Sequence, residues 1–191
     1  MQLPWDEHFY QIVIPAWQAY RSAEAHLTEV VSSKNEGLLN CARYTALREA
    51  GAACFYVHHF GEIVLRANPR WLSADVKRPD DVVRWLSQFC VMMRTDRKVD
   101  DVSLLRDVAD ALKHAILSRH LDERQVSANE AVLVIATGFG EMSYGEGKYG
   151  GADQVVIATR SGKRALSSVL QNVIDAWRRS ADIPLPEVGA S

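Results

Sequence analysis

The sequence predicts a mainly α protein, an up-and-down bundle of four to five helices with a β-hairpin inserted before the C-terminal helix. Apolar residues recur at three- and four-residue spacing up to about residue 118, which indicates long amphipathic helices. The period then changes to two β-branched runs between about residues 131 and 160, and helical spacing returns afterwards. With 191 residues, 48% of them apolar, we expect one domain spanning residues 1–191.

The first two predicted helices cover residues 6–31 and about 38–67. Pro15 lies inside the first helix, where its ring and missing N–H predict a kink or a fresh start. Asn68 and Pro69 end the second helix, because proline disfavours the α conformation in the residue before it. The apolar arc of the second helix is rich in alanine, which permits close approach of a neighbouring helix.

The third predicted helix begins after residues 73–75 or at Pro79, carries apolar residues as far as Met93 and ends at about Asp96. The fourth covers residues 99–118 and has the clearest apolar stripe in the chain. Short connections between these helices favour antiparallel neighbours. In a ring of four helices, this connectivity places the second and the fourth on a diagonal.

The hairpin is predicted at about residues 131–160, with a glycine-rich tip between its strands. Residues 145–150 match GxGxxG, but a strand follows them where a phosphate-binding loop needs a helix, so we interpret them as a mobile tip. The aromatic and methionine side chains at the tip and a local basic cluster indicate a contact surface; they are Phe139, Met142, Tyr144 and Tyr149, and Lys148, Arg160, Lys163 and Arg164. A final helix is predicted from Lys163 to about Arg179, followed by a disordered tail over 181–191.

The composition excludes several classes of function. A net charge of -2 and a pI near 6.3 provide no general basic field for nucleic acid or anionic membranes, so RNA binding is not indicated. The longest uncharged apolar stretch, 131–140, is about half of a membrane span. We see no secretory signal, and three cysteines without CxxC spacing are typical of reduced thiols, so we expect a protein of a bacterial-type cytoplasm.

A metal site is one hypothesis for the polar residues of the second and fourth helices. His58 with Glu62, and Asp110 with His114, each lie four residues apart, so each pair can present two ligands on one helix face to a divalent metal. The alternative is a solvated or ion-paired surface, which the angular positions of these residues favour. Tyr44 and Phe55 lie on the same side of the second helix as Glu62, and we therefore expect that side to be partly covered.

General acid–base catalysis is a second hypothesis, with His114, Lys113, Asp110 and Asp107 as the catalytic set. A carboxylate beside an imidazole can hold it in one tautomer. The alternative, which we prefer, is that Asp110 pairs with Lys113 and His114 along one exposed helix face.

Arg21 and His26 match the Arg-x4-His spacing of HEPN-type ribonucleases, in which the pair acts at a dimer interface. Chance alone is expected to produce this spacing in a chain with so many arginines. On a regular helix, the two side chains point about 140° apart, so a single site is hard to build from them.

The segments LREAGAACFYVHHFGEIVL at 47–65 and LLRDVADALKHAILSR at 104–119 resemble parts of bacterial and phage-associated helical proteins that are similar in outline to the HEPN group. The resemblance covers about 40 residues directly. It implies a helical bundle with a hairpin appendage and a homodimer, and it implies no substrate. The chain lacks the late Arg-polar-x-His pattern of the nuclease members.

These observations favour a non-catalytic interaction protein that self-associates, without a cofactor, and contacts a protein partner through the hairpin tip or the face from Arg106 to His114. The alternative is a HEPN-like or metal-dependent hydrolase or ribonuclease that uses the His/Asp/Glu cluster.

Overall fold

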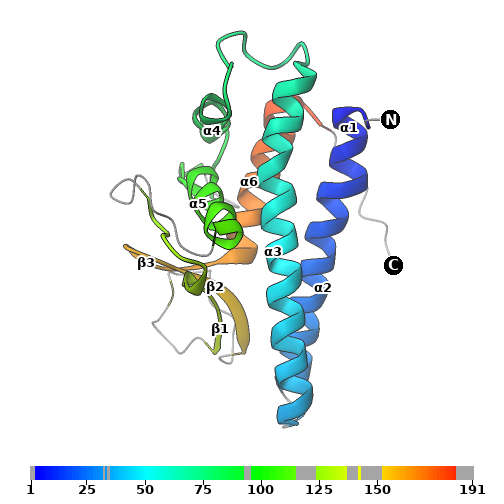
Figure 1. The fold of residues 1–191 in the computed structure, drawn as a ribbon, viewed down its shortest axis with the longest axis vertical. Helices are drawn as coiled ribbons and strands as arrows, with labels where there is room; N and C mark the ends of the chain where they lie inside the picture. Colours follow the sequence, from blue (N-terminus) through cyan, green and yellow to red (C-terminus); the bar gives the residue numbers. More distant parts are fainter. Residues whose placement is uncertain are drawn as a thin grey trace.

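The N-terminal part of the chain is helical from residue 5 to residue 31 (Figure 1). The computed structural model describes residues 3–31, 33, 35–92, 96–114, 124–136, 142 and 152–183. Helix α1 (Trp5–His8) continues into a π-helical segment (Phe9–Val13) and then into α2 (Ile14–Val31). The wide π turn lies directly before Pro15, where a proline cannot donate to the preceding turn. The helix therefore continues past Pro15 through a local change of winding instead of a break.

Helix α3 (Glu36–Ala67) is the longest element of the described structure and starts two residues earlier than the sequence predicts. The side chain of Asn35 caps it by accepting a hydrogen bond from the backbone N–H of Leu38 at 3.1 Å. It ends, as predicted, at Asn68, which adopts a left-handed conformation before Pro69. Helix α2 packs along α3, whose facing alanines are buried: Ala42, Ala46, Ala50 and Ala53.

Helices α4 (Pro79–Ser87) and α5 (Asp101–His114) follow. Helix α4 begins at Pro79, which is one of the two predicted starts, but the expected end near Asp96 is wrong. The chain leaves the helix in a turn after Ser87, and Val91 then pairs with Lys98 in an isolated bridge. Residues 115–118 of the predicted fourth helix lie outside the described residues.

The predicted hairpin is part of a three-stranded antiparallel sheet of β1 (Val132–Ala136), β2 (Asp153–Thr159) and β3 (Gly162–Ala165), preceded by a 3₁₀ turn (Asn129–Ala131). The predicted helix start at Lys163 is wrong, because residues 162–165 pair with β2. Helix α6 (Leu166–Ala181) begins directly after the third strand. The hairpin tip, 137–151 apart from Met142, and the tail from residue 184 lie outside the described residues.

Buried polar contacts join the sheet to the helices. Asp101 of α5 is fully buried, and its carboxylate accepts hydrogen bonds from Arg164 Nη1 at 2.7 Å and from Asn172 Nδ2 at 2.7 Å. Glu24 of α2 accepts the backbone N–H of Val155 in β2 at 3.0 Å. A buried carboxylate without such partners destabilises a fold, so these bonds fix the sheet against α2, α5 and α6.

Helix α3 contacts α2 and also α4, α5 and α6 (Figure 1). The second and fourth predicted helices therefore pack directly against each other as α3 and α5, whereas a simple ring would place them on a diagonal. Within the described ranges, no helix is long and apolar enough to cross a membrane.

Candidate functional site

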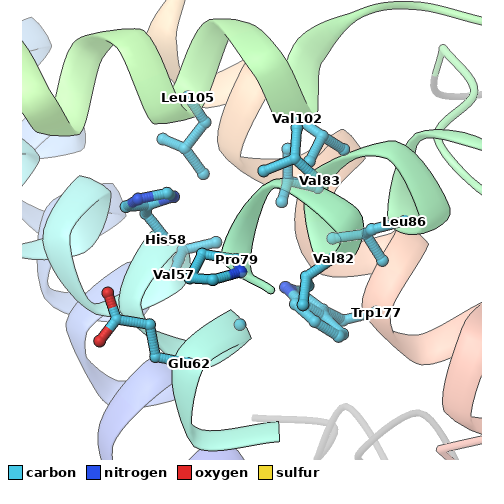
Figure 2. A pocket seen from close by; sticks show the side chains of 12 residues that line it. Val57, His58, Glu62, Pro79, Val82, Val83, Leu86, Val102, Leu105 and Trp177 are labelled. Carbon is cyan, nitrogen blue, oxygen red and sulfur yellow. The ribbon is translucent and has the colours of Figure 1, made fainter. Parts of the chain in front are cut away.

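A small cavity lies where α3, α4, α5 and α6 meet (Figure 2). Its volume is about 40 Å³, which is room for two or three water molecules. The lining is mostly apolar and consists of Val57, His58, Gly61, Glu62, Pro79, Val82, Val83, Leu86, Val102, Leu105, Val173 and Trp177. Two of the proposed metal ligands, His58 and Glu62, therefore line one cavity.

The ring of His58 lies beside Leu105, between α3 and α5 (Figure 2). Burial, the largest effect, lowers the pKa of this imidazole below its ordinary value of 6.5, against the opposing effect of the Asp110 and Glu62 charges. The imidazole is therefore neutral at pH 7. Within the described part of the chain, we find no hydrogen bond to the ring.

Gly61 and Trp177 form another part of the cavity wall. A methyl group added at Gly61 would lie 3.2 Å from Val82 Cγ1 and 3.7 Å from Trp177 Cζ2, so this glycine allows α4 and α6 to approach α3 closely. The indole N–H of Trp177 is buried without an acceptor among the described residues, and the same holds for Trp17 and Trp71. This feature is thus shared by several core tryptophans and does not single out the cavity.

The proposed metal ligands come partly together. The packing of α3 against α5 brings the charges of Glu62 and Asp110 near His58, whereas His114 lies one turn farther along α5 and is exposed. The carboxylate of Asp110 is paired with Arg124 Nη1 at 2.8 Å. Among the described residues, there is no group of three or more His, Cys, Asp or Glu side chains that could hold a metal ion. The divalent-metal site stays a prediction from the sequence.

The proposed catalytic set is divided between the interior and the surface. Asp107 is buried and accepts hydrogen bonds from Arg106 at 3.1 Å, from Arg124 at 3.2 Å and from the backbone N–H of Gln125 at 2.8 Å. Lys113 and His114 are exposed at the end of α5. These contacts give Asp107 a structural role, because they hold the segment around residue 125 against α5. The catalytic role of the set stays a prediction.

Arg21 and His26 lie apart on α2. The guanidinium of Arg21 lies 5.0 Å from the ring centroid of Trp17, and the exposed His26 ring lies 3.7 Å from the carboxylate of Glu29. The structure of one chain does not bring the pair together.

A surface with two exposed aromatic side chains runs along α3. It consists of residues at three- and four-residue spacing, and we call it the α3 face: Tyr44, Arg48, Gly51, Phe55, His59, Glu62 and Arg66. Phe55 is 46% exposed, so the expected partial cover is present there, whereas Tyr44 is 75% exposed and lacks such cover among the described residues. The ring of His59 stacks on Phe55, with 5.4 Å between centroids and 14° between planes.

Gly51 lies in the middle of the α3 face, and a methyl group added there would meet no atom within 4 Å. A glycine inside a helix costs about 1 kcal/mol relative to alanine. Among the described residues of one chain, no packing contact requires a glycine at this position, whereas Gly61 is required by its close neighbours. The spacing of Tyr44 and Phe55 in the sequence already indicates that they lie on one helix face. The open space above Gly51 is visible only in the structure.

No known protein family, no curated protein and no solved structure matches this chain.

Proposed function

We propose that the protein is a non-catalytic interaction protein that self-associates through the α3 face. The observation that carries this proposal is the pair of exposed aromatic rings, Tyr44 and Phe55, on either side of a helical glycine that the chain's own packing does not use.

The energetics of the α3 face favour a partner. Burying a fully exposed phenylalanine side chain is worth roughly 1.5–3 kcal/mol, and covering the exposed 46% of Phe55 is worth a corresponding part of it. Aromatic residues are also enriched at the centres of protein interfaces. A glycine allows the backbone of a second helix to approach, which compensates for its poor helix propensity. Both features stabilise an association and neither stabilises the single chain.

The polar residues of α5 support a non-catalytic role. Asp107 and Asp110 are bound to arginines, and Lys113 and His114 point into solvent at the end of α5. The resemblance of residues 47–65 to HEPN-like bundles would also imply a dimer, and this segment contains Phe55 and Gly51.

The experiment is sedimentation velocity over a concentration series of the wild-type chain, Phe55→Glu and Leu38→Glu. We expect the sedimentation coefficient of the wild type to rise with concentration, and that of Phe55→Glu to stay at the monomer value. Leu38 is the matched control, because it is 54% exposed on the same helix but about 100° from Phe55. A monomeric wild type, or equal behaviour of both variants, would overturn the proposal.

A further inference from the structure

We propose that two copies of the chain pair through their α3 faces in an antiparallel arrangement, with a two-fold axis at Phe55. This inference rests on the proposed self-association and specifies its geometry. Such an axis places each residue opposite the residue of the second copy that lies equally far from position 55 on the other side.

The charges of the α3 face are complementary to themselves in this arrangement. Arg48 and Glu62 both lie seven residues from Phe55, so each Arg48 meets Glu62 of the partner subunit. Their side chains are 73% and 52% exposed and are free to reorient, since their present partners, Glu49 and His59, are neighbours on the same helix. Two intermolecular ion pairs form per dimer.

The outermost residues of the α3 face are also complementary to each other in this arrangement. Tyr44 and Arg66 both lie eleven residues from Phe55, so each tyrosine ring meets the guanidinium of Arg66 of the partner subunit. A parallel arrangement would instead place Arg48 against Arg48 and Glu62 against Glu62. Like charges directly opposite each other are destabilising, and the antiparallel arrangement is therefore favoured.

The centre of the pairing is aromatic. Phe55 meets Phe55 of the partner subunit on the axis, and each ring is already stacked on His59 of its own chain. Gly51 lies opposite His59 of the partner subunit, where the missing side chain provides room for the imidazole. The exposed aromatics and the glycine thus have one common explanation.

The size of the face predicts a weak dimer. Residues 44–66 span about 33 Å of helix and a strip about 10 Å wide, which is on the order of 300 Å² per copy. Standard interfaces bury about 800 Å² per partner. We therefore expect a dissociation constant in the micromolar range or above.

The test exchanges charges between two chains. Arg48→Glu alone and Glu62→Arg alone each place like charges at both pairs of a homodimer, and we expect each to weaken self-association at least about tenfold. Mixing the two variants restores two opposite-charge pairs, and we expect a heterodimer with an affinity close to that of the wild type. A mixture that stays as monomeric as its components would overturn the antiparallel pairing.

Cross-linking in a Cys41→Ser background tests the position of the axis. Chains with Gly51→Cys and chains with His59→Cys, once mixed, are expected to form a disulfide faster than either alone. If Gly51→Cys instead cross-links to Phe55→Cys and not to His59→Cys, the axis at Phe55 is wrong while self-association stands. If the wild type is monomeric at all concentrations, the proposed function itself fails.

Discussion

At the residue scale, His58 shows how the fold changes the meaning of a side chain. Its spacing from Glu62 suggests a metal ligand, and α3 and α5 do pack together as that hypothesis requires. The structure places the ring among apolar side chains, where the neutral form is favoured. The identity and spacing of such residues can be read from the sequence. Their burial depends on which helices become neighbours, and no local pattern encodes that.

The pKa shift of His58 predicts a loss of stability in mild acid. Its pKa is lowered in the folded chain, and so is that of His8, chiefly by burial. The unfolded chain therefore takes up protons first as the pH falls below about 6.5, so this stability is present above that pH and is lost below it. Urea unfolding between pH 7.5 and 5 measures the effect.

We expect His58→Gln to flatten this pH dependence, because glutamine does not titrate. His26→Gln is the matched control, since it makes the same substitution at an exposed histidine of α2. A steeper or unchanged dependence in His58→Gln would contradict the assignment of a buried neutral imidazole.

At the scale of elements, hydrophobic periodicity predicted the helices well because it persists over many turns. The start of α4 at Pro79 and the end of α3 at Asn68 follow from local backbone chemistry, and both are confirmed. The third strand was missed because residues 162–165 are too few to show a period of two. Their strand pairing depends on β2 and on the contact between Arg164 and Asp101, which is 63 residues away.

Gly51 and Gly61 of α3 are expected to respond differently to substitution. Gly51→Leu should raise the free energy of unfolding of the monomer by roughly 0.5–1 kcal/mol through helix propensity, and should weaken self-association. Gly61→Ala should gain little or none of this stability, because its methyl group would lie 3.2 Å from Val82 Cγ1 and the resulting crowding opposes the helix-propensity gain of about 1 kcal/mol.

Urea unfolding at dilute monomer concentration and sedimentation of the same samples measure both effects. If Gly51→Leu stabilises the monomer and still weakens association, the weaker association comes from the interface and not from unfolding. Undiminished association of Gly51→Leu would contradict close approach of a second helix at this position.

At the scale of the whole molecule, the sequence predicted the mainly α class and the position of the sheet before the last helix. It did not predict how the helices surround α3, because the choice among ring, layer and irregular packing depends on contacts between distant segments. The α3 face follows from that packing: α2, α4, α5 and α6 contact other sides of the helix and leave its aromatic stripe exposed.

The native cysteines allow the central claim to be measured on the wild-type chain. Cys41 is exposed on α3, whereas Cys54 and Cys90 are buried. Burial raises the pKa of both buried thiols to about 12, so a thiol-specific label will attach to Cys41 in the folded protein.

The most direct measurement is the distance between nitroxide labels on the two Cys41 side chains. It is determined by pulsed electron paramagnetic resonance at a concentration where the chain associates. An antiparallel pairing with its axis at Phe55 places the two positions about 42 Å apart along the helices. We predict a distance distribution centred near that value. A short distance, as parallel helices would produce, or the absence of any intermolecular dipolar signal would contradict the account.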